Sequence, residues 1–190
     1  MAKRMFLALD ISATNKVEIA QWRQQHLSLP FKAVDPQNFH ITLAFLGLID
    51  DIKQANIEKL IAQQHSVIQQ QLKPFVANKA VSLVLSQVGY FEKAQVLHLM
   101  PKTILNWLTY LNNKIVDASL KCGITLESRS YQPHLSLYRK AKCQSFQPSK
   151  KTQDTVVEQQ LSITSFSLYH SYSTPRGVHY QPVQRWKISF

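Results

Sequence analysis

The same order of elements occurs twice along the sequence, and each copy ends on a strand that carries a histidine. In each half an apolar run precedes a helical pattern, and a second apolar run then carries His40 or His134. These segments are 5–11, 12–25 and 39–46 in the first half, and 95–100, 104–120 and 131–138 in the second. The two histidines lie about half of the 190 residues apart. Such a repeat predicts two similar lobes, with one histidine from each at a shared cleft.

The remaining segments add strands and one long helix. Segment 50–72 carries apolar residues at near-helical spacing behind an acidic start, which predicts an amphipathic helix. The other expected elements are strands at 81–88, 161–172 and 178–190, a turn at 89–92, a strand end at Gly47 and a basic loop at 139–153. This pattern predicts the α+β class, as a single two-lobed domain over residues 1–190.

The charge balance is consistent with a polyanionic partner. Lys and Arg number 22 against 11 Asp and Glu, for a formal net charge of +11. Such a surface attracts nucleic acid, because binding releases the cations that are condensed on the phosphate backbone. A charge that serves only solubility explains the same numbers.

Nothing in the sequence indicates export, a membrane span or a disulfide framework. The apolar run near the N-terminus stops at Asp10, short of the apolar region of a signal peptide. No apolar run reaches the length of a transmembrane helix. Cys122 and Cys143 stand without a C-x-x-C motif, as reduced thiols of the cytosol do. We expect a cytoplasmic, soluble monomer without membrane contacts.

Each histidine belongs to a His-x-Thr/Ser motif. In a strand, side chains two positions apart share a face, so Thr42 lies beside His40 and Ser136 beside His134. The alternate residues are expected to face the core: Phe39, Ile41, Leu43 and Phe45 in the first motif, and Leu135 and Leu137 in the second. An imidazole beside a hydroxyl, on a strand with a buried back, can contact a single phosphate.

Two such units are sufficient for phosphodiester hydrolysis without a metal or other cofactor. A neutral imidazole can deprotonate the attacking water while a protonated one gives its proton to the leaving oxygen. Histidine reaches both states near neutral pH. Arg139 is the candidate cation for the phosphate, although strict alternation places it on the face opposite His134. Its role requires a β-bulge, or a strand that ends near Tyr138.

Other interpretations of these residues are weaker on chemical grounds. A single His-x-Ser/Thr motif is more often structural than catalytic, so the repetition is what favours function. Five more histidines are expected to be structural or surface residues: His26, His65, His98, His170 and His179. Neither motif has an acidic residue at the spacing of a zinc site. The chain has 4 glycines and no glycine-rich phosphate loop, which argues against chemistry on ATP.

Segments 38–47 (NFHITLAFLG) and 133–139 (PHLSLYR) resemble the paired signatures of the two-histidine phosphoesterase superfamily. Within it they are most similar to the bacterial and archaeal RNA 2′,3′-cyclic phosphodiesterases, also called 2′-5′ RNA ligases. The resemblance extends to 6–10, 166–169, 180–182 and 185–186. It implies a bilobal α+β fold in which two antiparallel sheets face a central cleft, with the helices on the outside.

The resemblance also implies an activity and a set of roles. The reaction is hydrolysis of an RNA 2′,3′-cyclic phosphate to a 2′-phosphate end. His40 corresponds to the proton donor for the 3′ oxygen and His134 to the base for water. Thr42 and Ser136 would hold the phosphate, and Arg139 corresponds to the arginine after the second motif. Ser136 is a departure, since the family often has threonine there.

Two further functions stay open. The first is a non-catalytic module that binds RNA in the same basic cleft. The second is ATP-independent joining of RNA ends through a 2′-5′ linkage, which by microscopic reversibility uses the same histidines. The sequence does not indicate the natural RNA or its preferred base.

Overall fold

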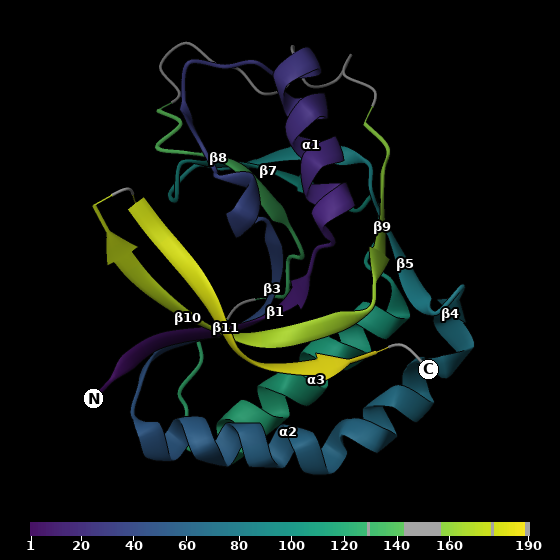
Figure 1. Ribbon diagram of the computed structural model, residues 1–190, viewed down its shortest axis with the longest axis vertical. Helices are drawn as coiled ribbons and strands as arrows, with labels where there is room; N and C mark the ends of the chain where they lie inside the picture. The colour runs from purple at the N-terminus through teal and green to yellow at the C-terminus, as the bar shows by residue number, and fades with distance from the viewer. Residues whose placement is uncertain (129, 143–156, 176, 189–190) are drawn as a thin grey trace.

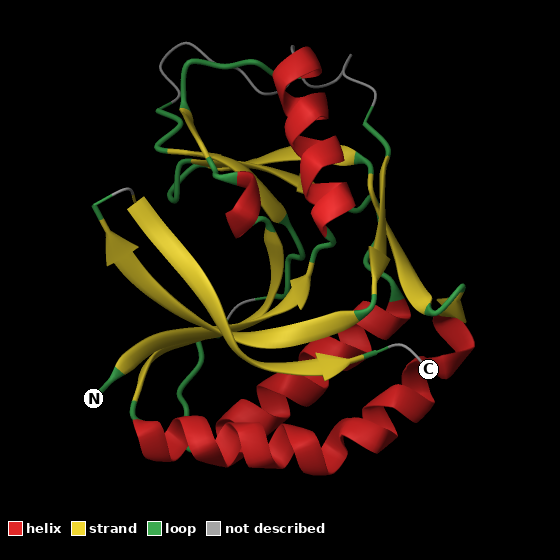
Figure 2. Cartoon of the chain, viewed as in Figure 1, coloured by secondary structure: helices red, strands yellow, loops and turns green. Residues whose placement is uncertain are grey.

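The computed structural model describes residues 1–128, 130–142, 157–175 and 177–188, which form helices and antiparallel strands (Figures 1 and 2). The helices are α1 (Ala13–His26), α2 (Asp51–Leu72) and α3 (Asn106–Lys121), with 3-10 turns η1 (Pro36–Asn38) and η2 (Lys73–Phe75). The strands are β1 (Lys3–Asp10), β2 (Lys32–Ala33), β3 (His40–Ile49), β4 (Val76–Ala77), β5 (Ala80–Leu85), β6 (Gln87–Phe91), β7 (Val96–Met100), β8 (Leu135–Arg139), β9 (Gln159–Ile163), β10 (Ser165–Thr174) and β11 (Gly177–Lys187). The predicted α+β class is confirmed.

Two four-stranded sheets share the same arrangement over three of their strands. One is ordered β11-β10-β1-β3 and the other β2-β8-β7-β6. In each, a central strand (β1 or β7) pairs with the strand of a histidine motif on one side and with another strand on the other side. The repeated order of elements in the sequence therefore corresponds to a repeated topology. A third sheet, β4-β5-β9, was not expected. It arises because the predicted strands 81–88 and 161–172 each divide into two, at Ser86 and Thr164.

Each half of the chain sends its helix to the sheet of the other half. Helix α1 follows β1 but packs toward β2 and β8, where Arg23 donates hydrogen bonds to the backbone oxygens of Val34 (2.7 Å) and Leu137 (3.0 Å). Helix α3 follows β7 but contacts β3, and α2 packs against α3 on the same side of the molecule (Figure 1). The exchange connects the two sheets to each other.

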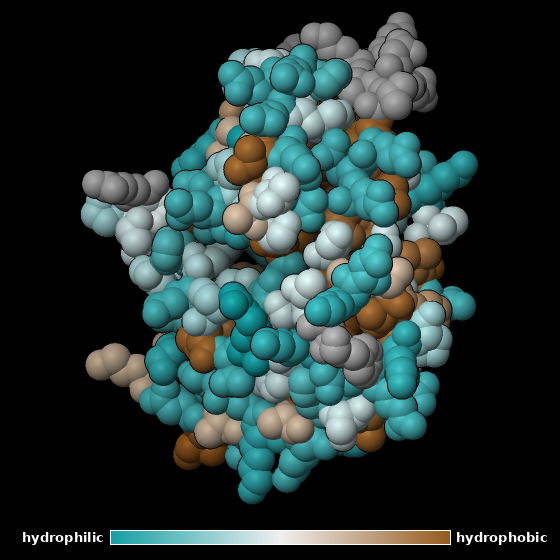
Figure 3. All heavy atoms as spheres, turned by 45° about the vertical axis from the view of Figure 1, so that its right-hand side comes forward, coloured by the Kyte–Doolittle hydropathy of each residue, from teal (hydrophilic) through white to brown (hydrophobic). Residues whose placement is uncertain are grey.

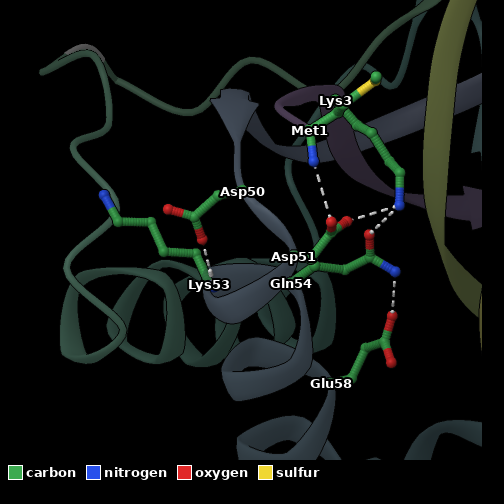
Figure 4. A network of polar contacts seen from close by, with 7 residues as sticks. All are labelled: Met1, Lys3, Asp50, Asp51, Lys53, Gln54 and Glu58. Atoms are coloured by element: carbon green, nitrogen blue, oxygen red, sulfur yellow. Dashed lines mark hydrogen bonds and ion pairs between the residues drawn. The ribbon is translucent and has the colours of Figure 1, made fainter.

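Capping residues explain where the helices begin. The Ser12 side chain accepts a hydrogen bond from the Asn15 N–H (3.1 Å) at the start of α1. Figure 4 shows the start of α2, where Asp50 accepts from the backbone N–H of Lys53 (2.8 Å). Nearby, Asp51 pairs with the side chain of Lys3 (2.8 Å). This exposed ion pair connects β1 to α2 but is screened by water.

Several predicted boundaries were wrong. Strand β3 continues through Gly47, whose φ of +71° fits a second irregularity in its pairing with β1. Residues 89–91 belong to β6, and the turn follows at 92–95. Residues 131–134 precede β8 instead of forming its first part. The predicted loop 139–153 is described only to residue 142.

Twelve large apolar side chains are exposed among the described residues. The face in Figure 3 is mostly hydrophilic, with apolar side chains in separate small groups. Among the described residues, no helix has the length and hydropathy needed to cross a membrane. Cys122 is a half-buried thiol whose pKa is raised by burial, and Cys143 lies outside the described residues.

Candidate active site

The two motif histidines are held by the same backbone device. The Nδ1 atom of His40 lies 2.7 Å from the carbonyl oxygen of Asn38, and that of His134 lies 2.8 Å from the carbonyl oxygen of Gln132. A carbonyl oxygen can only accept, so Nδ1 carries the hydrogen in each ring. In the neutral state Nε2 is then the nitrogen that accepts a proton. Both histidines are thus set in the same tautomer by the carbonyl two residues upstream.

A β-bulge follows the hydroxyl residue of the first motif. In the pairing of β3 with β1, Thr42 lies opposite Ala8 and Ala44 opposite Leu7, so Leu43 is the extra residue. Leu43 and Ala44 are both buried as a result. The alternation is displaced by one position, and Phe45 is 42% exposed. The expectation that Phe45 faces the core was wrong for this reason.

The second motif has a bulge at the corresponding place. In the pairing of β8 with β7, Ser136 lies opposite His98 and Tyr138 opposite Leu97, so Leu137 is the extra residue. Leu137 and Tyr138 are both buried, and Arg139 is exposed. The bulge that the predicted role of Arg139 requires is therefore present.

Side chains from the exchanged helices satisfy the carbonyl groups of the two extra residues. Asn112 of α3 is buried and donates from Nδ2 to the Leu43 oxygen at 2.7 Å. Arg23 of α1 donates to the Leu137 oxygen at 3.0 Å, which also accepts from the backbone N–H of Val34 at 2.9 Å. A bulge leaves backbone groups without a ladder partner, so each helix stabilises the bulge in the opposite sheet.

Aromatic rings surround His40. Its ring centroid lies 4.9 Å from that of Phe6 and 5.0 Å from that of Tyr180. Burial lowers the pKa of His40 to about 4, the Asn38 carbonyl opposes this shift, and the charges of Arg139, His134 and Lys16 add to it. In the absence of substrate, His40 is therefore neutral near pH 7.

Asp10 organises a polar network beside this aromatic group. Its carboxylate accepts hydrogen bonds from the hydroxyls of Ser165, Ser167 and Tyr169, and it pairs with Arg185 at 3.1 Å. Burial and the neighbouring carboxylate raise the pKa of Tyr169, so its hydroxyl stays protonated and donates. The alternating hydroxyl residues of β10 are visible in the sequence, but Asp10, which accepts from all three, lies in β1.

The surroundings of His134 are different. Its ring centroid lies 4.8 Å from that of Phe91 and 5.2 Å from that of His98, edge-on to both.

The remaining histidines have contacts elsewhere: His26 stacks on Trp22, His65 bonds to the Lys187 backbone, and His170 and His179 lie beside Tyr172.

A cavity of about 930 Å³ is lined by two of the predicted site residues, Thr42 and His134, and not by His40, Ser136 or Arg139. Thr42 and Phe45 of one sheet line it together with Phe91 of the other sheet and His134. The charges of His134 and Arg139 act on His40 across the cleft. The structure therefore places Thr42 and His134 in one cavity, and the charges of Arg139 and His134 influence the pKa of His40. Their roles stay predictions.

No cluster of three or more His, Cys, Asp or Glu side chains that could hold a metal occurs among the described residues.

The sequence matches the family profile described as "AKAP7 2′5′ RNA ligase-like domain" over residues 7–174. The RNA 2′,3′-cyclic phosphodiesterase of Methanocaldococcus jannaschii is 26% identical, over 96% of this chain and 99% of the relative. That of Escherichia coli is 25% identical, over 98% and 97%. A crystal structure of E. coli LigT with 3′-AMP has a TM-score of 0.77 at 23% identity, covers 98% of each chain and shares the fold. The chain belongs to the AKAP7 2′5′ RNA ligase-like domain family.

Proposed function

We propose that this protein hydrolyses RNA 2′,3′-cyclic phosphate ends to 2′-phosphate ends, without a metal, through His40 and His134 in one two-lobed domain. The relatives from M. jannaschii and E. coli are named for this activity, and this chain matches almost their whole length. The observation that carries the proposal is the matched pair of Nδ1–carbonyl bonds, because it makes Nε2 the proton-exchanging atom of both rings.

The proton transfers follow the roles that the family resemblance implies. Nε2 of His134 accepts a proton from water as the water oxygen forms a bond to phosphorus. The bond between phosphorus and the 3′ oxygen breaks, and His40 gives its proton to that oxygen. The 2′ oxygen keeps the phosphate. Each positioned acid or base contributes a factor of about 10² to 10⁴.

The low pKa of His40 requires a source for its proton. The cations that lower this pKa, Arg139 and Lys16, are the groups that a bound phosphodiester would neutralise. The negative charge of the phosphate also favours an imidazolium directly. We infer that His40 takes up its proton as the substrate binds.

Arg139, Thr42 and Ser136 would hold the phosphate. The two hydroxyls can donate to its non-bridging oxygens, and the guanidinium can balance the charge that develops in the transition state. The net charge of +11 would attract RNA to the cleft, with an affinity that falls as salt rises.

The test is digestion of a defined oligonucleotide with a 2′,3′-cyclic phosphate end, in EDTA, followed by identification of the terminal phosphate. We expect a 2′-phosphate product from the wild type, and a kcat lower by about 10² to 10⁴ in His40→Ala and in His134→Ala. His65→Ala is the control. His65 lies on α2, away from the cleft residues, and its ring bonds to the backbone oxygen of Lys187 at the end of β11. Full activity of either motif variant would refute the proposal.

The same experiment separates the two alternatives. An RNA-binding module would retain the oligonucleotide in a salt-dependent way and leave its end unchanged. End joining would give a longer product with a 2′-5′ linkage when a second RNA with a 5′-hydroxyl is added. Loss of turnover in EDTA would contradict metal independence alone.

A further inference from the structure

A third histidine, His98, is buried next to His134. It lies in the centre of β7, is 2% exposed and pairs across the ladder with Ser136. The sequence predicts that it is a structural or surface residue. A buried polar ring beside a proposed catalytic base has a more specific consequence, which its contacts define.

His98 and Phe91 together form a two-ring wall. Their centroids lie 4.0 Å apart with the planes 22° from parallel. The ring of His134 meets both edge-on, at interplanar angles of 86° to Phe91 and 65° to His98. Edge-to-face contacts of this kind are favourable and directional. With the Gln132 carbonyl at Nδ1, the wall restrains the plane of the His134 ring and therefore the direction of Nε2.

The position opposite His98 in the sheet is a glycine for reasons of space. A Cβ atom at Gly89 would lie 2.5 Å from Nε2 of His98 and 2.9 Å from its Cε1. The other three glycines, Gly47, Gly123 and Gly177, have positive φ angles, and a Cβ atom there would have nothing within 4 Å. The backbone conformation at position 89 does not require glycine. A glycine there leaves space for the His98 ring.

The lowered pKa of His98 keeps its ring uncharged. Burial lowers the pKa of His98 to about 4, and the charge of His134 contributes to the shift. His98 therefore stays neutral near pH 7 and does not compete for the proton that His134 exchanges.

We propose that His98 is a positioning residue, which with Phe91 holds the ring of His134 in the orientation needed for proton transfer. The effect on catalysis rests on the proposed function, whereas the effect on the orientation of His134 does not.

Turnover of the cyclic phosphate provides the first test. We expect His98→Ala to lower kcat by about 10- to 100-fold, since a small misplacement of a catalytic group costs this much, and to change KM by less than about threefold. His98→Phe, which restores an uncharged ring, should recover most of the loss. The matched control is Leu99→Ala, in the same strand with 0% exposure on the core side. It should lower stability but leave kcat of the folded protein unchanged.

Gly89→Ala is the second test, because it displaces the ring without removing the imidazole. We expect a loss of kcat of about tenfold or more in the wild-type background. In the His98→Ala background the methyl group has no ring to displace, so the second substitution should add no further loss. Additive losses would show that Gly89 acts independently of His98, which overturns this part of the argument.

The third measurement does not depend on turnover. The ¹⁵N shifts of His134 report its tautomer, and we expect the Nδ1–H form in the wild type and in Leu99→Ala, but a mixture in His98→Ala. If the wild type has no turnover, the proposed function fails and these spectra still decide the role of His98. The proposal is overturned if His98→Ala matches Leu99→Ala in kcat and tautomer, or if His98→Phe is as impaired as His98→Ala.

Discussion

The two halves of the site have the same backbone conformation but different side chains. Both motifs fix the histidine through the carbonyl two residues upstream, at 2.7 and 2.8 Å, and both have a bulge directly after the hydroxyl residue. The residue that each bulge exposes is Phe45 in the first half and Arg139 in the second. Equivalent positions thus carry an aromatic ring and a cation. The shared backbone determines where the groups lie, and the side chains around it determine how the halves divide the chemistry.

The surroundings of the histidines differ in the same way. His40 lies among Phe6 and Tyr180 with a pKa lowered to about 4, whereas His134 lies against Phe91 and His98 and lines the cavity. A ring that is neutral without substrate and gains a proton with it suits a donor that acts only on bound phosphate. This comparison gives physical support for unequal roles, which the two motifs alone did not.

The largest expected effect separates the acid from the base. On the cyclic phosphate, His40→Ala and His134→Ala should each lower kcat by about 10² to 10⁴. On a nucleoside 2′-(p-nitrophenyl) phosphate, the leaving oxygen needs no proton. His40→Ala should then lose less than about tenfold, while His134→Ala keeps its full loss, as measured by release of p-nitrophenolate. If His134→Ala were instead the variant that loses less than about tenfold on this substrate, the two roles would be reversed.

The next effect compares the residues that follow the two bulges. Arg139→Ala should lower kcat/KM by about 10²-fold, because the proposed mechanism uses its cation to balance the charge of the transition state. Phe45→Ala should cost less than about fivefold. The Arg139 charge lowers the pKa of His40, so its removal raises that pKa and moves the alkaline limb of the pH–rate profile to higher pH. An equal loss in both variants would contradict the proposed division.

A third effect concerns the helix side chains that hold the bulges. Arg23→Ala and Asn112→Ala should each lower the free energy of unfolding by about 1–3 kcal/mol, because the first removes the side-chain donor of the Val34 oxygen and the second that of the Leu43 oxygen. The loss is measured by urea unfolding. Gln24→Ala and Asn113→Ala, exposed neighbours on the same helices, should stay within about 0.5 kcal/mol of the wild type. Unchanged stability in both test variants would mean that water replaces the lost donors.

Local signals in the sequence predicted most of the framework. The two segments predicted as helices at 12–25 and 50–72 begin at Ser12 and Asp50, and the side chains of both residues cap the helices. The repeated order of strand, helix and histidine strand corresponds to the pairing of β3 with β1 and of β8 with β7 in the two sheets. These features depend on residues close in the chain, where periodicity and capping rules apply.

Features that depend on a second segment were not predictable. A bulge is defined by the partner strand, so the exposure of Phe45 could not follow from alternation in β3 alone. Gly89 was expected to form a turn, but it lies in a strand against the ring of His98. The network around Asp10 joins β1 to β10 and β11, which only the fold brings together.

The smallest expected effect tests how far the two hydroxyl residues are equivalent. Thr42→Val and Ser136→Ala should each cost about tenfold in kcat/KM, since each removes one of the proposed donors to the charged phosphate. Thr42→Ser and Ser136→Thr keep the hydroxyl and change only the methyl group, so each should stay within about threefold of the wild type. Steady-state kinetics on the cyclic phosphate measures all four. A tenfold gain in Ser136→Thr would instead mean that the serine leaves its hydroxyl poorly oriented, and that the second half of the site is the less constrained one.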